Sequence, residues 1–166
     1  MRYAIPSLIA LILVQILKCV WDSIRNRTFS TRMLLSSGGM PSSHSAICTA
    51  LGTYIALTEG FHSPFFGVAL VLSTIVMYDA IGVRQETGRQ SVMLNELIDV
   101  FAEHGRPLNF KRKLNTLTGH TARQVVVGAF IGVVIGGCCV ILPLVIYGYD
   151  IMAIWEYILH KFRPLN

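Results

Sequence analysis

Four long apolar stretches constrain this chain more than any other feature of its sequence. They cover about residues 3–21, 41–61, 64–82 and 121–147, and the second and third are only just long enough to cross a bilayer. A helix needs about 20 apolar residues to span the hydrocarbon core, where no water can satisfy an open backbone. The sequence therefore predicts an all-α, polytopic membrane helix bundle with about four transmembrane helices.

The composition agrees with a membrane setting. Hydrophobic residues make up 53% of the chain and charged residues 14%, whereas about 25% of a soluble domain is charged. The net charge is +5, but the basic residues lie in loops beside the apolar stretches and lack interleaved aromatic residues. They therefore indicate anionic lipid or a phosphorylated substrate rather than nucleic acid. The four cysteines lack zinc-ligand spacing, so we expect no metal and no cofactor.

Residues 1–166 are predicted to form a single membrane-embedded domain, because no linker or low-complexity tract divides the chain. Two amphipathic helices are expected outside the spans. One lies within the long polar loop, at residues 91–104, and the other at about residues 151–163, where its pattern is typical of a helix in the membrane interface.

Three glycines of the last apolar stretch, Gly128, Gly132 and Gly136, recur every four residues. They lie on one face of a helix and allow another backbone to approach closely. This face is predicted to be a packing surface, and a homo-oligomer through helix 121–147 is one expected use of it.

With four crossings, the loops at residues 22–40 and 83–119 lie on the same side of the membrane. These loops hold most of the basic loop residues. The positive-inside rule then predicts a multi-pass cell-membrane protein whose shared loop side is cytoplasmic.

The most informative segment is Gly-Gly-Met-Pro-Ser-Ser-His-Ser at residues 38–45, at the start of the second apolar stretch. Paired glycines allow an unusual backbone path, and Ser42 and Ser43 present hydroxyls beside the unpaired N–H groups of a helix start, where anions bind. A well-capped membrane helix is the alternative. It explains the serines, but not Gly39 and its neighbour together with the ionisable His44 at a membrane boundary.

A second segment, Thr-Gly-His-Thr at residues 118–121, opens the fourth apolar stretch. By the crossing count, this helix begins on the same side as the second one. Two positive helix ends, with His44 and His120, are therefore expected to converge on one anion, with Gly119 beside it.

Charged residues near these helix starts are further candidates. Lys18, Arg25 and Arg32 can supply cations, although a lysine near a helix C-terminus also complements the helix dipole and snorkels. Asp79 falls at the C-terminal end of the third helix, where the dipole disfavours an anion, so it needs a partner. Arg84, Lys18 and an imidazole N–H are the candidate partners, and we expect Asp79 to have a site role rather than a purely structural ion pair.

These residues carry a family resemblance. Pro-Ser-Ser-His-Ser resembles the Pro-Ser-Gly-His-Ser motif of the type-2 phosphatidic acid phosphatase and haloperoxidase superfamily. The longer pattern resembles the small divergent branch of that superfamily over about residues 5–140. The segments that carry it are 38–45, 78–80, 82–84, 94–95 and 119–121.

The superfamily motifs match this chain in part. Lys18 and Arg25 have the spacing of the first motif, in which Asn26 replaces a proline, and His120 fits the nucleophile position. Leu114 stands where the third motif has arginine, and Gln124 stands where it has aspartate. The resemblance leaves Arg84 or Arg112 to replace the arginine, and Asp79 to orient an imidazole in place of Gln124.

The resemblance implies metal-independent phosphoryl transfer through a phosphohistidine. His120 would attack phosphorus while Asp79 or the Gln124 amide oxygen holds its other ring nitrogen, and His44 would protonate the leaving oxygen. The predicted function is a lipid-phosphate or polyprenyl-diphosphate phosphatase; the alternative is a non-catalytic membrane protein that binds or moves phosphorylated lipid. The predicted substrate-binding residues are Lys18, Arg25, Arg32, Gly39, Ser42, Ser43, Arg84, Gly119 and Gln124.

Overall fold

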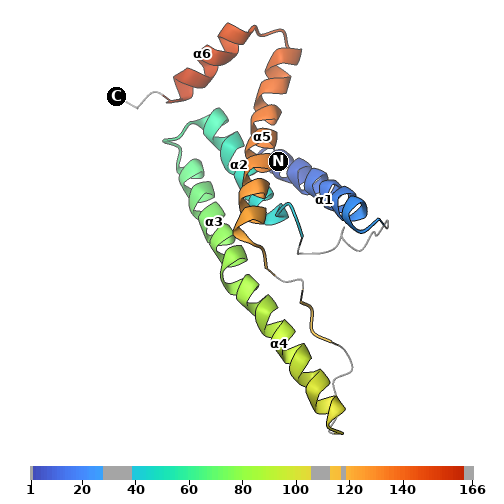
Figure 1. Cartoon of the computed structure of the whole chain (residues 1–166). Helices are drawn as coiled ribbons and strands as arrows, with labels where there is room; N and C mark the ends of the chain where they lie inside the picture. The colour runs from blue at the N-terminus through green and yellow to red at the C-terminus, as the bar shows by residue number, and fades with distance from the viewer. Residues whose placement is uncertain (1, 28–38, 106–112, 117–118, 163–166) are drawn as a thin grey trace.

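The computed structural model of the chain describes residues 2–27, 39–105, 113–116 and 119–162, and every regular element in these ranges is a helix (Figure 1). The all-α prediction is therefore confirmed. The helices are α1 (Ala4–Asn26), α2 (Ser43–Glu59), α3 (Pro64–Ile81), α4 (Val83–Glu103), α5 (Ala122–Ile146) and α6 (Ile151–Phe162).

Within the described residues, three helical segments are long and apolar enough to cross a membrane. They are Ala4–Ile24 in α1, the run Pro64–Glu103 that begins with α3, and Ala122–Ile146 in α5. Helix α2 has 17 residues and is not among them. Length and composition therefore support three of the four predicted crossings, and the chain is a helical membrane bundle.

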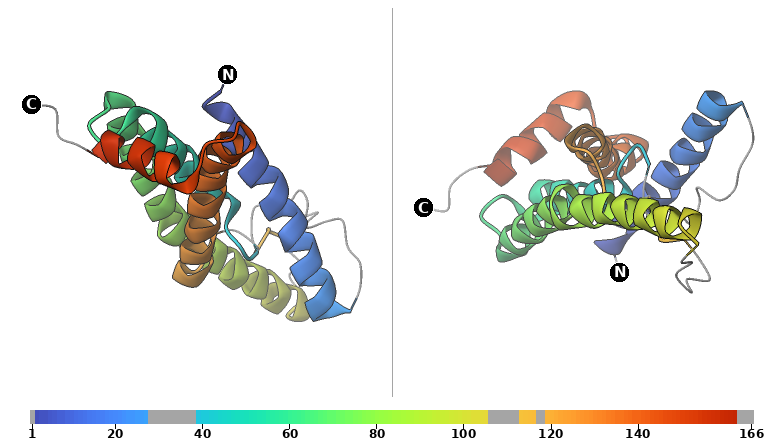
Figure 2. Two further views of the ribbon diagram at one scale, coloured as in Figure 1. Left: turned by 90° about the horizontal axis from the view of Figure 1, so that it is seen from above. Right: turned by 60° about the horizontal axis from the view of Figure 1, so that its bottom comes forward.

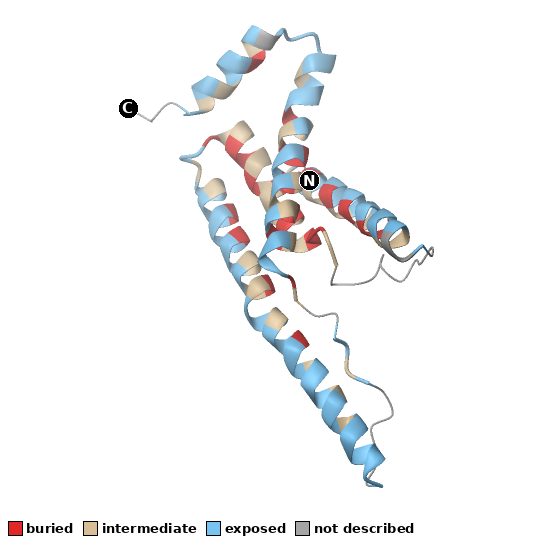
Figure 3. Ribbon diagram, viewed as in Figure 1, coloured by how far each residue is buried: buried red, intermediate tan, exposed pale blue. Residues whose placement is uncertain are grey.

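Helix α2 lies at the centre of this bundle and packs against α1, α3 and α5. Figure 3 shows buried residues concentrated on α2 and on the faces of α1 and α5 that turn toward it. Much of the outer surface of α1, α3 and α5 is exposed and apolar, as expected where lipid rather than protein is the neighbour.

Helices α2 and α5 run parallel in close contact along the glycine face. A Cβ atom on Gly136 would lie 2.6 Å from the carbonyl oxygen of Ala50. In the same way Gly128 abuts the backbone of Ser42, and Gly132 abuts that of Ala46. The matching order of these contacts means that α2 and α5 begin at the same end of the bundle. The predicted packing face is used within the chain, so an oligomer through these glycines would have to displace α2.

Several predicted helix boundaries were wrong. Helix α1 continues to Asn26 instead of ending near residue 21. Helix α2 begins at Ser43 and not at Pro41, because Ser42 has an extended backbone and acts as the N-cap, with its hydroxyl accepting a hydrogen bond from the Ser45 N–H. Helix α4 begins at Val83, directly after Gly82, and is longer than the predicted helix 91–104.

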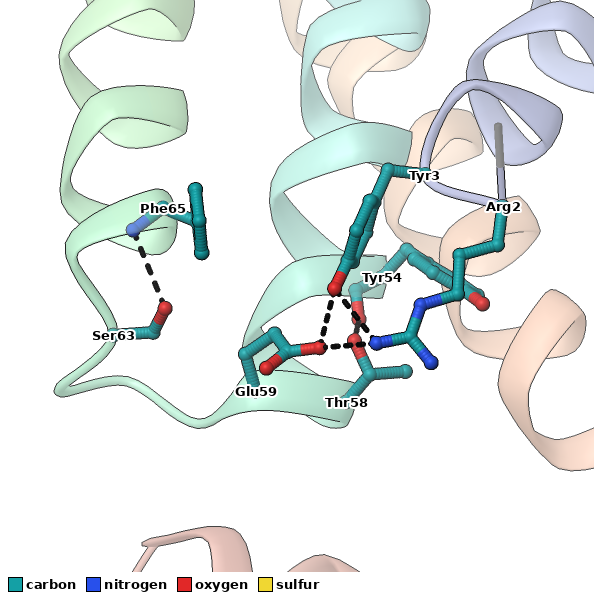
Figure 4. Close-up of polar contacts among 7 residues, drawn as sticks. All are labelled: Arg2, Tyr3, Tyr54, Thr58, Glu59, Ser63 and Phe65. Atoms are coloured by element: carbon teal, nitrogen blue, oxygen red, sulfur yellow. Dashed lines mark hydrogen bonds and ion pairs between the residues drawn. The ribbon is translucent and has the colours of Figure 1, made fainter.

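The two ends of the bundle differ in structure, because one end extends into α4 and the other is closed by polar contacts. Helix α3 and helix α4 follow one another as a long rod, and α4 extends away from the other helices (Figures 1 and 2). At the opposite end, Arg2 and the Tyr3 hydroxyl each donate a hydrogen bond to the Glu59 carboxylate, at 2.9 and 2.6 Å (Figure 4). This contact holds the start of α1 against the end of α2.

Helix α6 turns back at this same end. The rings of Phe61 and Phe162 lie 4.6 Å apart between centroids, which joins α6 to the turn between α2 and α3. Ile154 is buried while Met152 and Trp155 are exposed. An amphipathic helix is therefore present as predicted, and its place in the membrane interface stays a prediction.

Candidate functional site

The two histidine segments meet where α2 and α5 begin. His44 lies in the first turn of α2, and His120 directly precedes Thr121, the N-cap of α5. The two imidazole rings have centroids 5.9 Å apart and are nearly perpendicular, at 83°. The convergence expected from the parallel helix starts is therefore present.

His120 is fixed by its backbone. Its N–H donates a 3.0 Å hydrogen bond to the carbonyl oxygen of Ala80, near the end of α3. Gly119 has a φ of 85° and lies so close to the backbone of Gln85 that a Cβ atom would clash, so both its conformation and its contact require glycine. Sequence reasoning assigned no contact with this segment to Ala80, although Ala80 belongs to the family pattern, or to Gln85.

The His120 side chain is only 2% exposed, and its two ring nitrogens are buried without a hydrogen-bond partner among the described residues. Buried polar groups normally have partners. The two unbonded nitrogens therefore mark His120 as a candidate ligand-binding group.

Lys18 is the other buried polar group of the site. Its side chain is 1% exposed and donates a 3.2 Å hydrogen bond to the Ser43 hydroxyl. No carboxylate of the described residues lies within ion-pair distance of its ammonium group. Since a buried charge without an opposite charge is costly, the site holds a cation that an anion would stabilise.

The two predicted serines, Ser42 and Ser43, have different roles in the structure. The Ser42 hydroxyl accepts hydrogen bonds from the Ser45 N–H and hydroxyl, and the Ser42 N–H donates to the Gln124 carbonyl oxygen at 3.1 Å. The predicted direct contact of Ser42 with a ligand is therefore not supported, because its polar groups cap α2 and join it to α5. Ser43 faces Lys18 and stays a candidate.

Comparison with known proteins identifies the family of the chain. The sequence profile described as the divergent PAP2 family matches residues 2–135. The chain belongs to this family. Its relatives include the membrane protein YuiD of Bacillus subtilis (strain 168), which is 34% identical over 140 residues that cover 79% of this chain and 89% of YuiD. No solved structure matches the chain.

In this divergent PAP2 protein, neither predicted orienting group touches His120. Asp79 accepts a hydrogen bond from the Arg84 guanidinium, so its predicted cationic partner is Arg84. The Gln124 side-chain oxygen accepts from the Thr121 N–H at 2.8 Å, and the Gln124 N–H donates to the Thr121 hydroxyl. Gln124 is therefore half of a capping box for α5, which contradicts its predicted hold on the imidazole.

The electrostatic setting of His120 favours the neutral ring. Burial lowers the pKa of His120 to about 4, and the positive charges of Lys18 and Arg84 act in the same direction. A neutral imidazole keeps a lone pair on one nitrogen. At pH 7 the His120 ring is therefore neutral and carries a free lone pair.

The remaining predicted residues are less well placed. Gly39 is described, with a φ of 88° before the cis Met40–Pro41 peptide. The Arg25 side chain, Arg32 and Arg112 lie outside the described residues. Among the residues that are described, no three His, Cys, Asp or Glu side chains are grouped to hold a metal ion.

One residue of the family pattern has a contact that sequence reasoning did not assign. Asn95 makes two hydrogen bonds with the backbone of Leu114, which lies on the segment that leads to His120. Its presence in the Leu94–Asn95 pair was the signal, but no local pattern connects it with Leu114.

Proposed function

We propose that this divergent PAP2 protein is a lipid-phosphate phosphatase that transfers a phosphoryl group to His120, without a metal ion, and then to water. The observation that carries the proposal concerns Lys18 and His120, two buried groups that interact electrostatically. Among the described residues the Lys18 ammonium has no ion-pair partner and the His120 imidazole has no hydrogen-bond partner. A phosphate supplies both missing partners, because it brings negative charge to the lysine and an electrophilic phosphorus to the ring nitrogen.

The first chemical step joins a His120 nitrogen to phosphorus and breaks the bond between phosphorus and the lipid oxygen. In the free site burial and the charges of Arg84 and Lys18 lower the pKa of His44, whereas the negative charge of a bound phosphate favours its protonated form. The protonated His44 then donates its proton to the leaving oxygen, a contribution of roughly 10² to 10⁴ in rate for a well-placed acid. Lys18 and the positive ends of α2 and α5 stabilise the charge on the phosphoryl oxygens. Arg84 joins them if phosphate replaces Asp79 as its partner.

The second step regenerates the enzyme. His44, now neutral, accepts a proton from water while the water oxygen attacks phosphorus, and the bond from phosphorus to His120 breaks. Inorganic phosphate leaves, and His44 is again protonated. Each proton that His44 gives in the first step is therefore recovered in the second.

A lipid substrate fits the surroundings of Lys18 best. Leu17, Val20 and Trp21 flank it on α1 and are exposed on the outside of the bundle. A substrate with an apolar tail can keep that tail against this surface while its headgroup reaches the buried ammonium. Phosphatidate-type lipids and polyprenyl diphosphates both meet this requirement.

The test is release of inorganic phosphate by the purified protein in detergent, with several lipid phosphates and with EDTA present. We expect release from wild type, at least a hundredfold less from His44→Ala, and only slow residual release from His120→Ala. His62→Ala is the matched control, because His62 is an exposed histidine at the turn between α2 and α3. Equal release from wild type and both site variants would rule the proposal out.

One observation favours a second candidate, a non-catalytic protein that binds or moves phosphorylated lipid. No acceptor among the described residues holds the second nitrogen of His120, and such an acceptor normally orients a catalytic imidazole. Under this alternative, wild type binds a lipid phosphate and loses the binding in Lys18→Met, but releases no phosphate.

We also infer that the site opens to the cytoplasm, from the basic loops on its side. Cysteines introduced at Glu103, at the end of α4, and at Glu156, on α6, would report the two ends in a cysteine-free background. An impermeant maleimide should label Glu156→Cys in intact cells and Glu103→Cys only after permeabilisation. The reverse pattern would place the site outside.

A further inference from the structure

Helix α4 has an apolar face that no described part of the chain covers. Six residues form this face, the apolar stripe, and they are Met93, Leu94, Leu97, Ile98, Val100 and Phe101. At about 100° per residue all six fall on one side of the helix. Ile98 is partly buried, and the other five are between 38 and 68% exposed. Figure 3 shows α4 exposed along most of its length, and α3, which it follows, is the only helix that it contacts in the described part of the chain.

The contacts that α4 makes with the segment before α5 lie on the opposite face. The Asp99 side chain pairs with Lys113, and Gly119 packs on the backbone of Gln85. Around the helix axis Asp99 and Gln85 each lie about 160° from Phe101, on the far side from the stripe. These contacts therefore leave the stripe free for another molecule.

The position of the stripe along the rod places it outside the hydrocarbon core. Helix α3 has 18 residues and is about 27 Å long, close to the thickness of about 30 Å of that core. Helix α4 continues from it as a rod (Figure 1) and carries six charged residues among its 21, which are costly in the core. Lipid tails therefore do not cover the stripe, and a contiguous apolar patch in water is typical of a protein interaction site.

The spacing along α4 is typical of a helix that packs on another helix. Successive positions of one face are four and three residues apart in turn, which is the heptad pattern of coiled coils, at Val83, Thr87, Gln90, Leu94, Leu97 and Phe101. Thr87 and Gln90 are polar, so the apolar contact is confined to the outer half of α4.

Charge and orientation favour a second copy of the chain as the partner. The three carboxylates of the outer half, Glu96, Asp99 and Glu103, lie about 140–160° from Phe101 around the helix axis. Two identical stripes can therefore meet without like charges between them. A second copy in the same membrane has the same orientation and presents the same stripe at the same height. Self-complementary contacts of this kind are those of two-fold dimers.

We propose that the apolar stripe of α4 packs against the same stripe of a second copy, with the two helices parallel and a two-fold axis along the membrane normal. The glycine face of α5 stays on α2 in this dimer, so the dimer replaces the oligomer predicted through helix 121–147. The proposal does not depend on the proposed function, because no residue of the stripe belongs to the phosphate site.

Single cysteines in a cysteine-free background test the contact in native membranes. Oxidation with copper phenanthroline joins two thiols only where their Cα atoms come within about 7 Å. Leu94→Cys and Leu97→Cys should each give at least ten times more disulfide-linked dimer on a non-reducing gel than Glu96→Cys. Glu96 is the matched control, because it lies between the two leucines along the helix and is exposed outside the stripe. Equal cross-linking at all three positions, or none at the two leucines, would overturn the proposal.

A charged substitution tests whether the stripe holds the two copies together. In the Phe101→Cys protein, Leu94→Glu would place two carboxylates opposite each other and should lower cross-linking at least tenfold. Glu96→Ala should leave it unchanged. Undiminished cross-linking with Leu94→Glu would count against the stripe as the contact. If that variant does not accumulate in the membrane, the comparison of single cysteines still decides.

The membrane surface is the alternative partner, and fluorescence distinguishes it. A bimane label on Leu97→Cys should be insensitive to nitroxide-labelled phospholipid in vesicles of phosphatidylcholine and phosphatidylglycerol. Strong quenching of this label, together with no quenching at Glu96→Cys, would mean that α4 lies on the bilayer and would overturn the second-copy proposal.

Discussion

The imidazole of His44 stands almost perpendicular to that of His120, with 5.9 Å between the ring centroids. The His120 nitrogens have no hydrogen bond to His44 or to any other described residue, so the two rings are in contact but are not bonded to each other. Under the proposed function a single phosphate contacts both rings, with His120 as nucleophile and His44 as acid.

This relationship predicts non-additive losses. If both rings act on the same phosphoryl group, His44→Ala has nothing left to impair once His120 is gone. The double variant should therefore release phosphate as slowly as His120→Ala alone, measured as kcat in detergent. A further loss of tenfold or more in the double variant would mean that the rings serve separate reactions.

Replacement of the buried Lys18 should maintain or raise stability and weaken lipid-phosphate binding. Among the described residues Lys18 is buried without an ion-pair partner. A buried charge of this kind destabilises the folded protein, so its replacement by an apolar side chain of similar length should not lower stability. We expect Lys18→Met to unfold in detergent at the same temperature as wild type or higher, while its affinity for a lipid phosphate falls at least tenfold.

Lys161→Met is the control for that experiment, because Lys161 lies on α6 at the opposite end of the bundle. It should bind the lipid phosphate as wild type does. A Lys18→Met protein that unfolds several degrees earlier and still binds the lipid would make Lys18 a structural residue.

The sequence predicted those parts of the site that depend on local pattern. Helix starts are marked by glycine, serine and threonine, and the parallel course of the two helices followed from the crossing count, so the meeting of His44 and His120 could be expected. Gln124 was misassigned although its pattern was local. Thr-x-x-Gln is a capping box signature, and the family comparison favoured a site role over this simpler one.

Other contacts lay beyond any local pattern. Two of these contacts join residues that are distant in the chain. The His120 N–H donates a hydrogen bond to the Ala80 carbonyl oxygen, and the Asn95 side chain makes hydrogen bonds with the backbone of Leu114. Likewise the glycine face of α5 could be recognised, but not its neighbour, because a close-packing face fits a helix of the same chain or of another copy equally well.

The glycine contacts between α2 and α5 predict a strong effect of one methyl group. A Cβ at Gly132 would clash with the backbone of Ala46 and with the Thr49 hydroxyl. Gly132→Ala should therefore destabilise the protein by about 1–3 kcal/mol, as overpacking does, measured by reversible unfolding in mixed micelles. Gly137→Ala on the same helix meets no atom within 4 Å and should be neutral or slightly stabilising.

Because Asp79 pairs with Arg84, its replacement should affect substrate binding and leave kcat almost unchanged. A carboxylate that orients a catalytic histidine would instead affect kcat. Both side chains are substantially exposed, so Asp79→Asn should change stability by less than about 1 kcal/mol. Freed from the carboxylate, Arg84 can bind phosphate, and KM for a lipid phosphate should fall two- to fivefold with kcat nearly unchanged. A hundredfold fall in kcat would instead assign Asp79 to the imidazole.

The low pKa of His120 predicts how stability depends on pH. Burial, and then the charge of Lys18, lower that pKa from 6.5 to about 4. Between pH 6.5 and 4 the unfolded chain binds a proton at this histidine and the native ring does not. The contribution of His120 to stability is therefore fully present above pH 6.5 and is lost as the pH falls, by at most about 1.4 kcal/mol per pH unit.

Carboxylates also titrate near pH 4, so the measurement that isolates His120 is the difference in unfolding free energy between wild type and His120→Gln. Between pH 6.5 and 5 that variant should show a shallower slope than wild type and keep only the part that comes from His44, whose pKa burial also lowers. The exposed His62→Gln variant should follow wild type. If wild type and His120→Gln give parallel curves, the ring is protonated as easily in the native protein as in the unfolded chain, and it cannot be the buried neutral nucleophile.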